Sequence, residues 1–130
     1  KDDVVKQIVE NICVQNKNHV SCGVIGISWL MRGLSDNGFA DVAYRLATNK
    51  TYPSWGYMAE NGATTVWELW NGDKASPKMN SGNHVMLLGD LLTWAYQYLG
   101  GIRPVCRDKR NGLQALPPAA SLRHPGLRVG

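Results

Sequence analysis

The 130-residue sequence lacks several features that would assign it to a particular class of protein. It has no apolar run approaching the roughly 20 residues needed to cross a bilayer, so we expect no membrane-spanning segment. It has three cysteines and no CxxC pair, a pattern that predicts free thiols rather than a disulfide framework. Its three histidines, His19, His84 and His124, lack the spacing of metal ligands, so we expect no metal and no other cofactor.

Charge is also scarce, and the excess of positive charge lies at one end of the chain. Charged residues make up 18% of the chain, and the formal net charge is +4. Residues 1–102 hold eight Lys and Arg against nine Asp and Glu, which gives −1, whereas residues 103–130 hold six against one, which gives +5. Because the basic end has no Phe, Trp or Tyr among residues 105–130 and no helical or strand period, it does not predict a nucleic-acid surface.

These observations divide the chain into two parts. Residues 1–104 are expected to form part of one globular domain, consistent with a hydrophobic fraction of 44%. Residues 105–130 are expected to be a disordered basic tail, either a flexible linker or the product of a frame shift or cloning remnant. Since the first residues lead directly into an amphipathic pattern, we expect the N-terminus to be a cut inside a longer protein.

Apolar spacing predicts an all-α fold, because no strand-like alternation of useful length is present. The turn Ser35-Asp36-Asn37-Gly38 is short enough to make the second and third predicted helices an antiparallel αα-hairpin. Ser81 or Asn83 could cap the last helix, and Gly100-Gly101 ends it. We expect four helices, from Val4 to the turn at Asn16, over about 25–34, over about 40–48, and from Asn83 to Leu99.

The connections between these helices hold the polar and aromatic residues. Residues 19–26 form a small-residue loop in which His19 is a candidate site residue, although a single loop histidine is more often structural. Residues 52–58 are punctuated by Pro and Gly and predict a turn that displays aromatic side chains as a possible sugar platform. The stretch 63–70 is too short and irregular for a helix, and 71–81 is a polar loop.

The most informative stretch is Thr64-Thr65-Val66-Trp67-Glu68-Leu69-Trp70, which places one carboxylate between two indoles. Burying a charge costs several kcal/mol unless polar groups surround it, whereas an acid beside an indole is typical of carbohydrate sites. The alternative is a surface glutamate beside two tryptophans that anchor a core. This string alone does not decide between the two interpretations.

Four segments together resemble one known family. Their order and spacing are similar to those in the C-terminal part of the catalytic domain of bacterial and fungal α-L-rhamnosidases. The resemblance extends from about His19 to Pro104. The segments are Leu34 to Leu46, Pro53-Ser54-Trp55-Gly56-Tyr57-Met58, Gly62 to Glu68, and Met79-Asn80-Ser81-Gly82-Asn83-His84.

The resemblance implies part of an (α/α)6 toroid of helical hairpins, with an active site at one mouth. It also implies hydrolysis of terminal α-L-rhamnosides with inversion, in which Glu68 is the general base that deprotonates the attacking water. His84 corresponds to a sugar-binding histidine, and Trp55 and Trp67 would wall the pocket. Trp70 is a further candidate for substrate contact, as is His19 from the loop argument above.

Two parts of such an enzyme are missing from the sequence. Inversion needs a second carboxyl group roughly 6.5 to 9.5 Å from the first, and in this family that acid lies upstream, in an acid-rich segment that is absent here. Glu60 and Asp73 are nearest to Glu68 in sequence but sit in no matching motif. Four helices also cannot close a ring of twelve, so apolar helix faces should be exposed and could drive self-association.

Two alternatives to a rhamnosidase therefore stay open. The first is a noncatalytic helical fragment or module that binds carbohydrate or protein through Trp55, Trp67, Trp70 and His84. The second is a different helical-toroid glycosidase, because that architecture hosts several sugar specificities.

Overall fold

The computed structural model describes residues 2–76, 78 and 80–104, whose only regular structure is helical, with no strand among them. The all-α fold class predicted from the sequence is therefore confirmed. Residues 105–130, for which a disordered tail was predicted, lie outside the described residues. The α-helices are α1 (Asp2–Glu10), α2 (Val24–Asp36), α3 (Ala40–Thr48), α4 (Trp55–Glu60) and α5 (Val85–Trp94). The π-helical turns η1 (Asn11–Gln15) and η3 (Ala95–Leu99) continue α1 and α5, and η2 (Gly72–Lys74) is a 3₁₀ turn.

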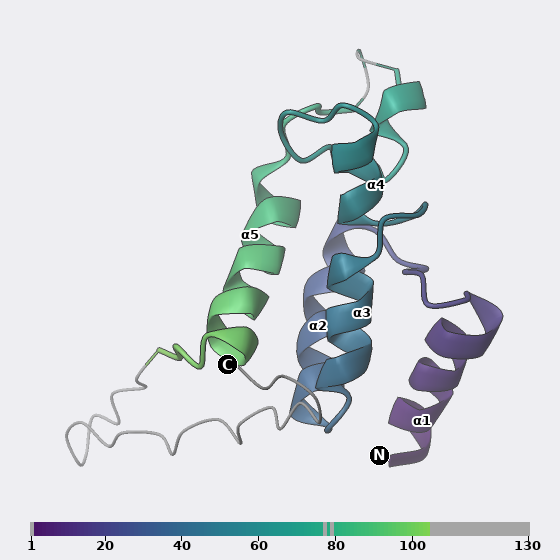
Figure 1. Ribbon diagram of the computed structural model, residues 1–130, viewed down its shortest axis with the longest axis vertical. Helices are drawn as coiled ribbons and strands as arrows, with labels where there is room; N and C mark the ends of the chain where they lie inside the picture. The colour runs from purple at the N-terminus through teal and green to yellow at the C-terminus, as the bar shows by residue number, and fades with distance from the viewer. Residues whose placement is uncertain (1, 77, 79, 105–130) are drawn as a thin grey trace, which may run out of the picture.

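The centre of the fold is the antiparallel hairpin of α2 and α3, as the short turn between them predicted. Figure 1 shows α5 on one side of this hairpin and α1 on the other, with α4 and the longest loop gathered at one end. The apolar side chains of α2 and α3 face inward at the helical spacing that the sequence displays. The buried hydrophobic residues are Ile12, Val20, Ile27, Met31, Leu34, Val42, Ala43, Leu46, Trp55, Met58, Leu87 and Trp94.

Two polar contacts join α5 and η3 to the end of α2. The indole Nε1–H of the buried Trp94 donates to Ser35 Oγ at 2.9 Å, and that hydroxyl donates to the Met31 carbonyl at 2.8 Å. The Tyr98 hydroxyl donates to Asp36 Oδ1 at 2.7 Å. Since a buried N–H without a partner is costly, the Trp94 bond favours this one placement of α5 on α2.

A fifth helix, α4, corrects the prediction of a turn over residues 52–58. Ser54 is buried, and its Oγ accepts a hydrogen bond from the Tyr57 N–H at 3.0 Å, so it is the N-cap of the helix. Gly56 lies within this helix and does not end it. A glycine is needed at this position because a Cβ would collide with the backbone carbonyl oxygen of Asn49. The glycine therefore lets α4 lie against the end of α3 and bury Trp55 and Met58.

The start of α5 also differs from its prediction. The N-cap is His84, whose Nδ1 accepts from the Leu87 N–H at 3.3 Å, and not Ser81 or Asn83. Ser81 Oγ accepts instead from the Asn83 N–H at 3.1 Å, which stabilises the turn before the helix. The predicted end of the helix at Gly100-Gly101 is confirmed.

Three loops meet at the α4 end of the molecule, at the top of Figure 1. Asn49 Nδ2 donates to the Asn18 carbonyl at 2.9 Å, which joins the loop after α3 to the loop after η1. Trp70 Nε1 donates to the Cys22 carbonyl at 2.8 Å, which joins the long loop between α4 and α5 to the residues before α2. All of the predicted site residues lie in or beside these loops.

Candidate functional site

The two halves of the loop between α4 and α5 are held together by backbone hydrogen bonds. The Glu68 N–H donates to the Ser81 carbonyl at 2.9 Å, and the His84 N–H donates to the Val66 carbonyl at 2.7 Å. The segment that contains Glu68 therefore runs beside the segment that leads into α5. This pairing brings Glu68 and His84, two of the predicted site residues, onto adjoining parts of one loop.

The carboxylate of Glu68 is fixed by the same neighbour. Its Oε2 accepts a hydrogen bond from the Ser81 N–H at 2.8 Å, so Glu68 and Ser81 each donate one N–H and accept one bond. Hydrogen bonds to an ionised carboxylate are stronger than neutral ones and hold its orientation. Among the described residues, no hydrogen bond or ion pair engages Oε1, and the side chain is partly exposed. The second oxygen is thus available to accept a proton from water.

Trp67, which directly precedes Glu68 in the chain, lines a small cavity. Gly72 lies so close to the indole that a Cβ at this position would be 2.5 Å from Trp67 Cγ. The cavity has a volume of about 170 Å³, which is below the roughly 300 Å³ at which ligand pockets usually begin. Its lining residues are Trp67, Leu69, Gly72, Ala75, Asn80, Ser81 and Gly82.

Trp55 and Trp70 hold the long loop on the helices. Their rings meet edge to face, with centroids 5.1 Å apart and an interplanar angle of 88°. Trp55 is 7% exposed, and Trp70 is bound through its Nε1–H to the Cys22 carbonyl. These contacts favour the anchoring role that the sequence left open for the tryptophans. Contact of either ring with a substrate stays a prediction.

The two predicted site histidines both contact protein groups. His19 Nδ1 lies 2.9 Å from the Asn16 carbonyl oxygen, and its Nε2 lies 2.7 Å from Thr51 Oγ1. His84 uses Nδ1 to cap α5. Because both ring nitrogens of His19 are engaged, the geometry favours a structural role for it, whereas a substrate role for His84 through Nε2 stays a prediction.

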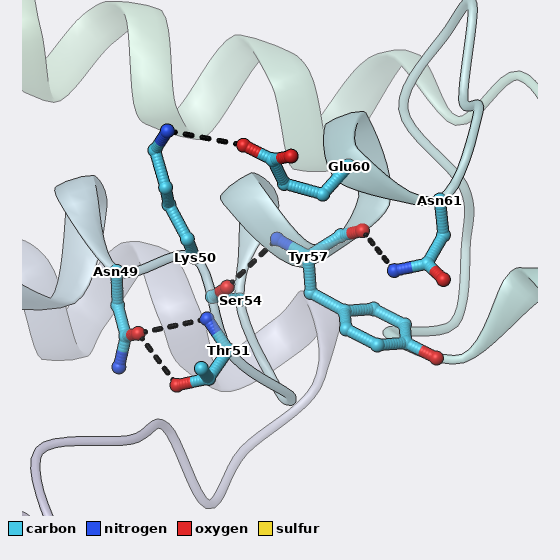
Figure 2. Close-up of polar contacts among 7 residues, drawn as sticks. All are labelled: Asn49, Lys50, Thr51, Ser54, Tyr57, Glu60 and Asn61. Atoms are coloured by element: carbon cyan, nitrogen blue, oxygen red, sulfur yellow. Dashed lines mark hydrogen bonds and ion pairs between the residues drawn. The ribbon is translucent and has the colours of Figure 1, made fainter.

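The two other acids close to Glu68 in sequence have partners of their own. Glu60 Oε1 forms an ion pair with Lys50 Nζ at 3.0 Å (Figure 2). Asp73 Oδ2 accepts a hydrogen bond from the Tyr57 hydroxyl at 3.1 Å. Burial first, and then the hydrogen bond and negative charge of Asp73, raise the pKa of Tyr57 above its usual value. Neither acid contacts Glu68 through a hydrogen bond.

The described part of the chain contains no group of three or more His, Cys, Asp or Glu side chains placed to hold a metal ion. Within the same residues, no helix is both long enough and apolar enough to pass through a membrane. Cys13 and Cys22 are free thiols, as the cysteine spacing predicted, and Cys106 lies outside the described residues.

Two features of the site were not predicted from the sequence. One is the role of Ser81 in holding the Glu68 carboxylate, and the other is the contact between Tyr57 and Asp73. The partners are 13 and 16 residues apart and lie in irregular chain, where no period links them. The Met79-Asn80-Ser81 motif could have indicated the role of Ser81. Because this motif lies just before α5, Ser81 was instead predicted to cap that helix.

Comparisons with known proteins agree on one group of enzymes. The family described as the bacterial alpha-L-rhamnosidase 6 hairpin glycosidase domain matches residues 1–99. An alpha-L-rhamnosidase of Streptomyces avermitilis is 43% identical over 91 residues, which cover 66% of this chain and 9% of that protein. One from Formosa agariphila is 39% identical over 110 residues, which cover 81% of this chain and 12% of that protein.

A solved structure gives the same result. The Streptomyces avermitilis alpha-L-rhamnosidase complexed with L-rhamnose matches with a TM-score of 0.70 and 38% identity, over 77% of this chain and 10% of that one. The chain thus spans about a tenth of the length of the relatives that it matches.

Proposed function

This chain belongs to the six-hairpin glycosidase family of bacterial α-L-rhamnosidases, and from that premise we propose that it supplies the general-base part of a rhamnosidase active site. Its fold is a fragment of the (α/α)6 toroid. The proposed substrate is a terminal α-L-rhamnoside, and the proposed reaction is hydrolysis with inversion at the anomeric carbon. The proposed base is Glu68.

The observation that supports this role is the arrangement of the Glu68 carboxylate. One oxygen accepts from the Ser81 N–H, and the other has no partner among the described residues. In an inverting reaction, the free oxygen takes a proton from water while the water oxygen bonds to the anomeric carbon. The bond from that carbon to the leaving oxygen breaks on the opposite face, where a second acid must provide a proton.

We propose that this second acid comes from outside the chain. Glu60 is paired with Lys50, and Asp73 accepts from Tyr57, so both nearby carboxylates already serve local contacts. A complete active site would then require the rest of the domain. On its own, the chain should hydrolyse natural rhamnosides poorly, because loss of positioned proton transfer typically costs a factor of about 10² to 10⁴.

The experiment is a kinetic comparison in a complete α-L-rhamnosidase that contains this segment. Glu68→Gln should lower kcat by a factor of about 10² to 10⁴ while KM changes little, because the amide keeps the shape but cannot act as a base. Glu60→Gln is the matched control, and it should leave kcat close to that of the parent. A Glu68→Gln enzyme with kcat within about threefold of the parent would exclude Glu68 from proton transfer.

We also propose that the isolated chain self-associates through exposed apolar helix faces. The outer face of α5 and η3 exposes large apolar side chains at helical spacing: Val85, Leu88, Leu92, Tyr96 and Leu99. In sedimentation experiments, Leu92→Glu should shift the chain toward the monomer, whereas Ser76→Glu, which adds the same charge outside α5, should not. A monomeric wild-type chain would contradict self-association.

A further inference from the structure

A partly exposed aromatic pair stands beside a carboxylate at the end of the molecule where the loops meet. Tyr52, which is 52% exposed, contacts Tyr57 edge to face, with ring centroids 5.3 Å apart and an interplanar angle of 73°. The Tyr57 hydroxyl donates to Asp73 Oδ2 at 3.1 Å. The three side chains come from the loop before α4, from α4 itself and from η2, so the fold assembles the cluster from separate segments.

The aromatic residues of 52–58 therefore divide into two groups. Trp55 is buried, whereas Tyr52 is exposed and Tyr57 is half-buried. Figure 2 shows the ring of Tyr57 pointing away from the Lys50–Glu60 ion pair. The Ser54 cap fixes the first turn of α4, so Tyr57 projects from a rigid element.

The cluster adjoins the Glu68 segment through Trp67. Asp73 directly follows Gly72, whose backbone lies against the Trp67 indole, and Trp67 directly precedes Glu68. The Gly72–Trp67 contact therefore joins the segment that carries Asp73 to the segment that carries Glu68.

The chemistry of the cluster fits a pyranose ring. Aromatic rings bury large apolar areas and match the C–H face of a pyranose, while the edge-to-face contact keeps both rings in place. A carboxylate has about four acceptor positions, and the Tyr57 hydroxyl is the one side-chain partner of Asp73 among the described residues. The remaining positions can accept bonds from sugar hydroxyl groups.

We infer that Tyr52, Tyr57 and Asp73 form a second saccharide subsite, which binds a hexopyranose attached to the rhamnose. That this hexose is the leaving group rests on the function proposed above for Glu68. The binding surface itself does not rest on it, because all three side chains belong to the described residues and their contacts are complete within this chain.

The test is an NMR titration of the ¹⁵N-labelled 130-residue chain with an α-L-rhamnosyl-D-glucose disaccharide, with methyl α-L-rhamnoside as the comparison ligand. The disaccharide should shift the amide signals of Tyr52, Tyr57 and Asp73, and methyl rhamnoside should not. Tyr52→Ala and Asp73→Asn should each weaken disaccharide binding by about tenfold or more, as expected for residues that anchor a ligand.

A control makes the outcome specific. Tyr96→Ala removes a tyrosine that is 60% exposed on η3, and it should leave disaccharide binding unchanged. The titration measures binding and not turnover, so a failure of the catalytic proposal would not alter it. The inference is overturned if the disaccharide causes no shifts at the three residues, or if Tyr96→Ala weakens binding as much as Tyr52→Ala does.

Discussion

Glu68 is held by a backbone N–H and not by a cation. The two ion pairs of the described residues, Arg45 with Asp41 and Lys50 with Glu60, are both exposed and lie elsewhere. A backbone donor orients the carboxylate without adding a full positive charge beside it. Such an arrangement suits a group that must receive a proton during the reaction, and this is the physical basis of the role that we propose for Glu68.

His84 has a structural task that can be separated from any substrate role. Its Nδ1 caps α5, so His84→Ala should lower the free energy of unfolding by about 0.5 to 2 kcal/mol, the usual cost of losing a cap. His84→Asn, which can still accept the Leu87 N–H, should recover most of that loss. Urea denaturation of the three chains measures both effects. Equal stability of the wild type and His84→Ala would show that the contact is not a functional cap.

At the scale of elements, periodic segments could be predicted from the sequence and contacts between loops could not. The α2–α3 hairpin follows from apolar spacing and one short turn, because burial of a stripe determines a helix almost alone. By contrast, Glu68 meets Ser81 across 13 residues of irregular chain, and no local rule specifies that pairing. The fold class was therefore predicted correctly from the sequence, whereas the hydrogen-bond partner of Glu68 was not predicted.

The helix α4 shows why one element was missed. Pro53 and Gly56 are usual signals of a turn, and both occur in a stretch of only a few residues. In the structure, Ser54 caps the helix, and the space near Asn49 requires a glycine at position 56. The serine preceding Trp55 was the available signal, but the close approach of α4 to α3 is a tertiary fact that the sequence does not display.

The hydrogen bond between Tyr98 of η3 and Asp36 of α2 should make the stability of the chain depend on pH in the alkaline range. Burial first, and then the hydrogen bond and charge of Asp36, raise the pKa of Tyr98 from 10.0 to about 12. The folded state holds the proton of the Tyr98 hydroxyl more tightly than the unfolded state does. The contribution of this hydroxyl to the free energy of unfolding is therefore complete below pH 10 and is lost as the pH rises through about 12. The Tm difference between wild type and Tyr98→Phe should therefore narrow across that range.

The comparison with Tyr98→Phe is necessary because alkaline pH also changes other groups of the chain. Their effects are common to both chains and cancel in the difference. A Tm difference that stays constant from neutral pH through pH 12 would show that the Tyr98 hydroxyl does not contribute through Asp36.

At the scale of the whole molecule, the chain is a helical fragment with large exposed apolar surfaces. Ile25 and Trp29 of α2 are 80% and 74% exposed, and α5 exposes a second apolar stripe. Monomeric soluble proteins rarely leave such patches uncovered. The chain spans about a tenth of its relatives, so the rest of a six-hairpin domain would provide neighbours for these faces.

The division at Pro104 leads to a prediction about residues 105–130. Their composition, with a net charge of +4 beyond Arg103 and no aromatic residue, gives them little to bury. Truncation after Pro104 should therefore leave helical content and Tm almost unchanged. Circular dichroism on the full and truncated chains measures both, and a fall of several degrees on truncation would show that the removed residues pack on the domain.

The most direct test of the general-base role is chemical rescue by azide in a complete rhamnosidase that contains this segment. Azide needs no deprotonation, so it can attack the anomeric carbon of an aryl α-L-rhamnoside when the base is removed. Glu68→Ala should be slower than the parent by a factor of about 10² to 10⁴, and azide should restore turnover and yield β-L-rhamnosyl azide, the inverted product. If azide leaves the rate of Glu68→Ala unchanged, or if Glu68→Ala matches the parent without azide, Glu68 is not the base.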